Sequence, residues 1–119
     1  MSEPRIETTV AASIYAVRRE SRIRQYYLEQ IDGPGVRERI PLEKDEVIVG
    51  RANNADIEVP STWVSRHHAR LVRRGTDYQI WDNESQNGIF LNGVKIHSAV
   101  LRDGDVLQAA DCIFVYREA

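Results

Sequence analysis

Three short polar segments of this chain carry side chains that could bind a phosphate group. Gly50-Arg51 ends an apolar run, Ser65-Arg66-His67-His68 follows it, and Ser85-Gln86-Asn87-Gly88 comes third. An arginine guanidinium is planar, always charged and presents two parallel donors, which suits a phosphate. A serine hydroxyl donates one hydrogen bond, and an asparagine amide both donates and accepts. The ordered set therefore predicts an anion-binding site that no single segment would establish.

These segments lie in predicted loops of an all-β domain. From residue 25 onward, short runs rich in β-branched and aromatic residues alternate with turns that contain Gly, Asn or Asp. The expected strands cover residues 26–31, 36–40, 46–50, 57–59, 69–72, 78–81, 89–91, 106–109 and 113–116. Many short strands at near-regular spacing favour a sandwich or a barrel, with the polar segments at the strand ends.

The alternation of polar and apolar residues predicts which side chains are buried. Tyr78 and Ile80 alternate with Asp77 and Gln79, so one face of this strand should pack and the other should meet water. The Asn92-Gly93 pair predicts a type I′ hairpin turn, because both central positions need positive φ and these residues tolerate it.

The composition is that of one ordinary globular domain. The chain has 119 residues, of which 42% are apolar and 29% charged. Its net charge of -2 argues against general nucleic-acid binding, although a single phosphate needs only a local positive charge. No apolar run is long enough to cross a bilayer and no secretory signal is visible, so we expect a cytoplasmic location.

The chain offers no pattern typical of a metal site, a cofactor site or an active site. Cys112 is the single cysteine, which excludes an internal disulfide and a cysteine-based zinc cluster. The three histidines lack acidic or cysteine companions at ligand spacing. No catalytic spacing relates Asp56, Asp82, Glu84 and His67. We therefore expect no cofactor, no metal and no enzymatic activity.

The N-terminal part differs from the rest and is interpreted as an extension. Residues 1–22 are expected to be partly disordered, and residues 23–119 to form the domain. Residues 11–20 are compatible with either a short helix or a strand. A basic cluster made of Arg18, Arg19, Arg22 and Arg24 overlaps the end of this segment and continues beyond it. Such a cluster is most often a solvated face, with phosphate steering or partner docking as the alternative.

The order and spacing of the motifs resemble the forkhead-associated (FHA) domain family. The family pattern runs Gly-Arg, Ser-x-x-His, Ser-x-Asn-Gly and a closing Asn-Gly, and all four appear here in order between Gly50 and Gly93. The resemblance as a whole covers about residues 25 to 117. The resemblance implies an eleven-stranded β-sandwich with ligand-binding loops at one end. It also implies a module that binds phosphothreonine peptides in Ser/Thr-kinase signalling, with a phosphorylated kinase or kinase substrate as its partner.

The resemblance assigns roles to five ligand-binding residues. Arg51 and Ser65 would hold the phosphate, and Arg66 would assist through its backbone N–H and its side chain. Asn87 would hydrogen-bond the peptide main chain beside the phosphothreonine. Gln86 belongs to the same set, although the family often has Thr there, and it affects the expected peptide preference.

The resemblance also assigns residues that shape the loops. The expected loop-bracing residues are Gly50, His68, Gly88, Asn92 and Gly93. Peptide selectivity should come from variable loop positions, for which Thr62 and above all Trp63 are candidates. Trp81 is expected in the core, and Cys112 is expected to be a small buried residue.

Two further interpretations remain open at the level of sequence. Glu7-Thr8-Thr9-Val10 is similar to a segment that is phosphorylated in some bacterial FHA proteins and folds back into the protein's own pocket. Thr8 or Thr9 could then occupy the site of the same chain. The alternative to a phosphopeptide reader is an FHA-like structural or oligomerisation domain that uses a sheet face and needs no phosphate.

Overall fold

The computed structural model describes residues 25–35 and 38–119. The extension over residues 1–22, its boundary with the domain and the helix-or-strand question for residues 11–20 lie outside the described residues. So do Thr8 and Thr9. Within the described ranges, no helix is long and apolar enough to span a membrane.

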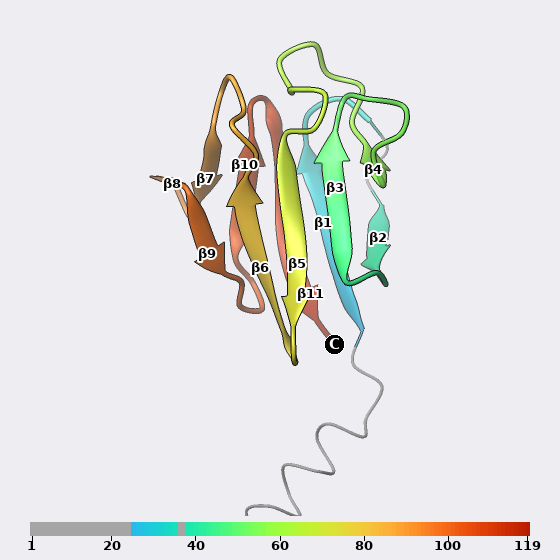
Figure 1. Ribbon diagram of the computed structural model, residues 1–119, viewed down its shortest axis with the longest axis vertical. Helices are drawn as coiled ribbons and strands as arrows, with labels where there is room; N and C mark the ends of the chain where they lie inside the picture. The colour runs from blue at the N-terminus through green and yellow to red at the C-terminus, as the bar shows by residue number, and fades with distance from the viewer. Residues whose placement is uncertain (1–24, 36–37) are drawn as a thin grey trace, which may run out of the picture.

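The described chain folds into eleven β-strands (Figure 1). They are β1 (Tyr26–Asp32), β2 (Arg39–Leu42), β3 (Glu46–Gly50), β4 (Ile57–Glu58), β5 (Ala69–Arg74), β6 (Asp77–Asp82), β7 (Ile89–Leu91), β8 (Val94–Ile96), β9 (Ser98–Val100), β10 (Val106–Ala109) and β11 (Cys112–Glu118). The all-β class and the eleven strands implied by the resemblance are confirmed. The strand pattern alone missed β8 and β9, which are short and carry exposed side chains.

The strands form two sheets that face each other. One sheet has the order β2-β1-β11-β10-β7-β8, and the other has the order β4-β3-β5-β6-β9. A single residue, His97, separates β8 from β9, so the chain passes directly from one sheet to the other on that side. On the opposite side β2 and β4 are the free edges of the two sheets (Figure 1).

Side chains from both sheets fill the space between them. Tyr78 and Tyr116 are fully buried from opposite sheets, with ring centroids 6.5 Å apart, and Tyr26 packs edge-on against Tyr78 at 5.2 Å. The Tyr78 hydroxyl donates to the Lys44 carbonyl at 2.6 Å. Such aromatic pairs contribute about 0.5–1.5 kcal/mol beyond the burial of their surface. Cys112 is fully buried as expected, and burial raises the pKa of its thiol to about 11.

Two expectations about individual strands were wrong. Trp81 is not a core residue, because Tyr78 and Ile80 take the inner face of β6 and leave Trp81 half-buried on the outer face. There its ring meets His97 edge-on, with centroids 5.9 Å apart, and the Arg70 guanidinium at 5.7 Å. Of the strand expected over residues 36–40, residues 36–37 lie outside the described residues, residue 38 is not in a strand, and β2 runs from Arg39 to Leu42.

Pro41 explains the second error. Proline weakens a strand signal in the sequence, but an edge strand tolerates it because one side of the strand makes no ladder bonds. β2 is such an edge strand.

The connections that carry the sequence motifs meet at one end of the sandwich. β3 and β6 run toward this end and β5 and β7 run away from it, since β5 is antiparallel to both β3 and β6. The β3–β4, β4–β5, β6–β7 and β10–β11 connections therefore gather there, at the top of Figure 1. The β7–β8 turn lies at the opposite end of β7.

Candidate functional site

Gly50 brings two of the motif loops into contact. A Cβ atom at this position would collide with the backbone carbonyl of Arg66. Only glycine therefore allows the backbone at the end of β3 to approach the backbone of the serine motif. The amide of Arg51 donates to the Ser65 carbonyl at 3.0 Å, and the amide of Ala52 donates to the Arg66 carbonyl at 3.0 Å. The end of β3 is thereby paired with the serine motif.

The Arg51 side chain is held by one nitrogen and keeps the others free. Its Nε donates to the Val64 carbonyl at 3.0 Å, and the residue is exposed. In the described part of the chain no carboxylate forms an ion pair with it. The terminal guanidinium nitrogens are therefore available to an anion, and a phosphate would meet no competing negative partner.

Ser65 retains the hydroxyl proton that a phosphate needs. Its Oγ accepts a hydrogen bond from the backbone N–H of Gln86 at 3.0 Å. A hydroxyl has one proton and two lone pairs, so a bond accepted through a lone pair leaves the proton free to be donated. This bond also joins the β4–β5 loop to the β6–β7 loop.

His68 connects the same two loops from behind. It is fully buried, its Nδ1 accepts from the Ser65 N–H at 2.9 Å, and its Nε2 lies 2.8 Å from the Gly88 carbonyl. A carbonyl only accepts, so Nε2 carries the proton and the ring is the neutral Nε2–H tautomer. A histidine with both nitrogens engaged in backbone bonds has no free atom for catalysis.

Asn87 uses part of its amide for the loops and leaves the rest exposed. Its Nδ2 donates to the Trp63 carbonyl at 2.6 Å. Its Oδ1 and the second Nδ2 proton are free to pair with a peptide main chain. Gly88 follows with φ +80°, a conformation that favours glycine, and its N–H donates to Ser85 Oγ at 2.9 Å.

Ser85 and Asp82 are bracing residues that the sequence analysis did not assign. The Ser85 N–H donates to Asp82 Oδ1 at 3.0 Å, and Ser85 Oγ accepts from Gly88. The motif Ser-x-Asn-Gly contained the signal for Ser85, because a serine three residues before glycine often closes a turn. The Gln86 side chain makes no described hydrogen bond and is exposed.

Arg66 contributes a backbone hydrogen bond and an exposed positive charge to the site. Its carbonyl accepts from Ala52, while its exposed side chain makes no described ion pair. Beside it, His67 Nε2 lies 3.0 Å from Asn54 Oδ1, and Asn83 Nδ2 donates to the His67 carbonyl at 3.1 Å. These bonds link three loops around the two arginines.

Trp63 stands at the rim of a shallow depression beside Asn87. Its side chain is 65% exposed, which is unusual for a residue of this size. The depression has a volume of about 410 Å³ and is lined by Trp63, Asn87, Phe90, Ala110 and Asp111. Thr62 is exposed next to it. Apolar rings with one carboxylate at the edge could accept the side chain of a peptide residue.

Ser61 and Asp111 fix this depression and were missed by the sequence analysis. Ser61 is 3% exposed, and its Oγ donates to Asp111 Oδ1 at 2.5 Å and accepts from the Trp63 N–H at 3.2 Å. The two residues lie 50 positions apart, so no local pattern could relate them.

Asn92 and Gly93 lie away from the other motif residues. Their φ angles of 51° and 86° confirm the predicted hairpin turn. Asn92 Oδ1 accepts from the Val106 N–H at 2.9 Å, and its Nδ2 donates to Asp105 Oδ1 at 3.1 Å. They therefore brace the turn before β10, at the end of β7 opposite Gly88.

The resulting candidate site lies at one end of the β-sandwich. It is a cluster of hydrogen-bond donors that are not fully used within the fold, together with the amide of Asn87. Among the described residues, no group of three or more His, Cys, Asp or Glu side chains is placed to hold a metal ion. The free groups are the guanidinium of Arg51, the hydroxyl of Ser65, the side chain of Arg66 and the amide of Asn87. Such a set suits a dianionic phosphate with peptide backbone beside it.

Comparison with known families agrees with this class of fold and site. The family model of the FHA domain matches residues 47–110, which is more than half of the chain. The chain therefore belongs to the FHA-domain family, as the motif order indicated.

Two of the relatives are proteins of Mycobacterium tuberculosis. The ABC transporter ATP-binding/permease protein Rv1747 of Mycobacterium tuberculosis is 43% identical over 77 residues, covering 65% of this chain and 9% of the transporter. The transcriptional regulatory protein EmbR of the same species is 41% identical over 78 residues, covering 65% of this chain and 20% of EmbR. The chain thus spans only a small part of these relatives.

Solved structures share the fold over most of the domain. One, from a study of phosphothreonine-dependent FHA domain interactions, superimposes with a TM-score of 0.72 at 29% identity, covering 78% of this chain and 95% of that chain. M. tuberculosis EmbR in complex with a low-affinity phosphopeptide superimposes with a TM-score of 0.76 at 30% identity, covering 92% of this chain and 30% of that chain.

Proposed function

We propose that this domain is a non-catalytic module that binds phosphothreonine peptides in Ser/Thr-kinase signalling in the cytoplasm. The observation that carries the proposal is the state of Arg51, Ser65 and Asn87. Each comes from a different loop, is anchored by one bond to a neighbouring loop, and keeps further donors free. A similar structure, EmbR, is described in complex with a phosphopeptide.

The energetics of such binding are adequate. A phosphothreonine brings about -1.5 to -2 charges and three acceptor oxygens. Each charge-assisted hydrogen bond contributes about 1.5–3 kcal/mol. Two or three of these bonds together with contacts from Asn87 to the peptide main chain support micromolar affinity, about -8 kcal/mol. The anchoring bonds hold the loops in place, which lowers the ordering cost of binding.

The partner is a protein that carries a phosphorylated threonine, such as a kinase or its substrate. In this proposal the exposed side chain of Arg66 supplies a second cation near the phosphate, and the exposed side chain of Gln86 contacts the peptide. Trp63 and Asp111 border the depression beside Asn87, so this depression selects the neighbouring peptide side chain. Its apolar floor and single carboxylate favour a side chain that is long and apolar or ends in a positive charge.

Phosphorylated Thr8 or Thr9 is a candidate ligand from the same chain. A tether of this kind raises the local ligand concentration to about millimolar, which is well above a micromolar dissociation constant. The phosphorylated protein should then bind added phosphopeptide more weakly than the unmodified protein. Equal affinity of the two forms would contradict this self-binding.

The proposal is tested by titration of the full chain with a degenerate phosphothreonine peptide library. Matched phosphoserine and unphosphorylated libraries serve as controls. We expect binding that requires the phosphate and prefers threonine. The Arg51→Ala variant should lose this binding, whereas Arg74→Ala, which removes an exposed arginine at the other end of β5, should retain it. Phosphate-independent binding would instead support a structural interaction domain.

A further inference from the structure

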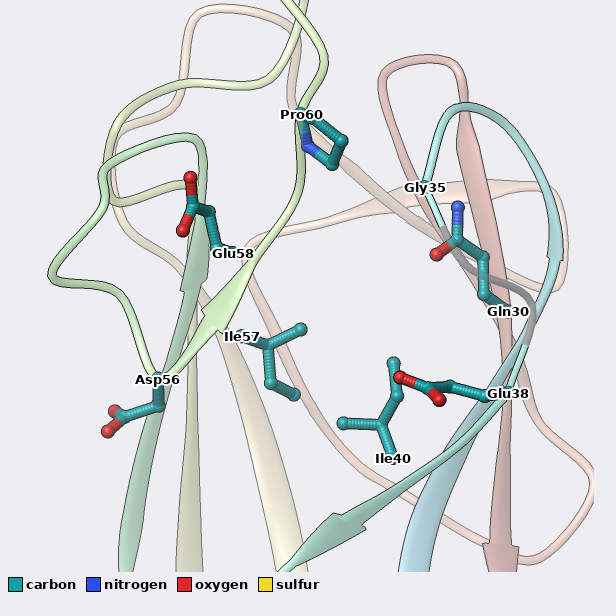
Figure 2. Close-up of a pocket in the computed structure, with 8 residues that line it drawn as sticks. All are labelled: Gln30, Gly35, Glu38, Ile40, Asp56, Ile57, Glu58 and Pro60. Carbon is teal, nitrogen blue, oxygen red and sulfur yellow. The ribbon is translucent and has the colours of Figure 1, made fainter.

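A groove separates the free edges of the two sheets, on the side where β2 and β4 end their sheets (Figure 2). Its volume is about 370 Å³. Ile40 of β2 and Ile57 of β4 face each other across its floor, and Glu58 stands on the β4 rim. None of these three residues belongs to the loops that carry Arg51, Ser65 and Asn87.

The polar atoms that reach into the groove are hydrogen-bond acceptors. Gln30 is only 7% exposed, and its Nε2 donates to the carbonyls of Asp32 at 3.3 Å and Pro34 at 2.8 Å. Its Oε1 faces the groove and has no described partner, and the Glu38 carboxylate points into the same space (Figure 2). Neither Glu38 nor Glu58 forms an ion pair with a described residue.

Asp56 borders the groove but belongs to a different set of contacts. Its carboxylate accepts from Lys44 Nζ at 2.6 Å and from the Ile48 N–H at 2.8 Å, and it turns away from the groove (Figure 2). These bonds lower the pKa of Asp56. Among the described residues, the unpaired carboxylate that points into the groove is that of Glu38. Glu58 lines the groove on β4, but its carboxylate lies on the same side of the strand as that of Asp56 (Figure 2).

An apolar floor with acceptors above it fits a long cationic side chain. The aliphatic stem of an arginine or lysine packs on apolar surface while its charged head reaches polar partners. Arginine fits better, because its guanidinium presents five donors and no acceptor. One head group could bond to Gln30 Oε1 and Glu38 together.

We propose that this groove binds Arg18 or Arg19, the two arginines of the chain's own basic cluster (Arg18, Arg19, Arg22 and Arg24) that lie furthest along the chain from Gln25. The charges are complementary, since residues 1–24 carry five arginines and three carboxylates, whereas residues 25–119 carry 15 carboxylates and 11 lysines and arginines. The segment is also long enough. Gln30 lies about 17 Å along β1 from Gln25, and the residues from 18 to 24 span up to about 23 Å.

The experiment uses a nitroxide spin label attached to a Ser21→Cys variant of the full chain. Cys112 does not compete for the label, because it is fully buried. The amide NMR signals of residues near Gln25 broaden whether or not the segment docks, because these residues are close to the label along the chain. Docking predicts additional broadening at Gly35 and Ile57, which line the groove.

The decisive comparison is between two variants with the same change of charge. In Glu38→Gln/Glu58→Gln the broadening at Gly35 and Ile57 should be lost, and in Asp45→Asn/Asp77→Asn, whose carboxylates lie outside the groove, it should persist. Replacing all four arginines of the basic cluster with glutamine should also abolish it, whereas Arg5→Gln should not. Well-dispersed spectra of each variant confirm that the domain is folded.

Three outcomes would overturn the proposal. These are the absence of broadening at the groove, broadening that persists in Glu38→Gln/Glu58→Gln, and broadening that arises between molecules. The last is detected by mixing spin-labelled, isotope-free protein with isotope-labelled protein that lacks the spin label, and it would assign the groove to a second copy. High salt should weaken true docking, because screening reduces the attraction between exposed charges.

Discussion

The two ends of the sandwich are both built from polar turns, but their side chains differ in how many of their hydrogen-bonding atoms are used within the fold. At the end that holds the β7–β8 turn, Asn92 uses both its oxygen and its nitrogen in bonds within the fold. Asp105 accepts from Asn92 and from the Arg102 N–H. At the other end Arg51, Ser65 and Asn87 each make one anchoring bond and keep other atoms free.

We interpret this difference as that between a scaffold and the proposed binding surface. A side chain whose hydrogen-bonding atoms are satisfied inside the protein stabilises a turn and has little left for a ligand. A side chain that is anchored but unsatisfied has a defined position and remains able to bind. The contrast is clearest for Asn87-Gly88 and Asn92-Gly93, which are the same dipeptide in opposite roles.

The largest effect is expected from Gly50→Ala, which should break the scaffold of the binding end. Its Cβ would collide with the Arg66 carbonyl, so we expect the free energy of unfolding to fall by about 3 kcal/mol or more. Gly75→Ala is the control, because no atom lies within 4 Å of a Cβ there and only its φ of +63° is strained. That variant should lose about 1–2 kcal/mol in urea denaturation. Equal losses would refute the close-approach argument.

Arg51→Ala should weaken phosphopeptide binding by about 2–5 kcal/mol, because the phosphate would lose its main cationic partner. This corresponds to a loss of about 30- to 5,000-fold in affinity by calorimetric titration. The free energy of unfolding should change by no more than about 1 kcal/mol, since a single bond to the Val64 carbonyl is lost. A folded variant with unchanged affinity would show that Arg51 lies outside the site.

The two asparagines should respond in opposite ways to the same substitution. Asn92→Ala should lower the free energy of unfolding by about 1–3 kcal/mol, because two side-chain bonds are lost and φ is positive. Its peptide affinity should stay the same. Asn87→Ala should instead weaken binding by about 1–3 kcal/mol. Loss of affinity in Asn92→Ala with a stable fold would contradict the assignment of the two ends.

The smallest effect is expected for Asp56, a side chain just before β4 whose two carboxylate oxygens both accept hydrogen bonds within the fold. Its pKa is lowered by the hydrogen bonds from Lys44 and Ile48, so the folded state favours the charged form. Its contribution is therefore present above the ordinary pKa of an aspartate and is lost as the pH falls through the lowered value. Asp56→Asn should be slightly less stable than the parent at neutral pH, and the two should converge in acid. A difference that persists in acid would point to another cause.

Much of the fold could be predicted because the relevant signals are local. Short runs rich in β-branched and aromatic residues, separated by turns, identified nine of the strands, and the motif order located the loops that meet at the binding end. β8 and β9 carried too little apolar pattern to be found, since Val94, Lys95 and Ser98 are exposed. Trp81 was assigned to the core because it lies in an alternating strand, although the alternation with Tyr78 and Ile80 places it on the outer face.

The site could be predicted in its residue types but not in its connections. The motifs named Arg51, Ser65 and Asn87, but which of their atoms remain free depends on partners from other loops. The Ser61–Asp111 bond spans 50 residues, and the opposite placement of two Asn-Gly pairs depends on the direction of β7. Such facts follow from the sheet topology and not from a local pattern.

The most direct test is to follow the backbone amide signals of the full chain while a phosphothreonine peptide is added. The account predicts that signals of Arg51, Ser65, Arg66, Gln86 and Asn87 shift, while those of Asn92, Asp105 and the turn before β10 stay in place. The unphosphorylated peptide should leave all of them unchanged. Shifts centred on the Asn92 end or on an outer sheet face, or equal shifts without the phosphate, would contradict the account.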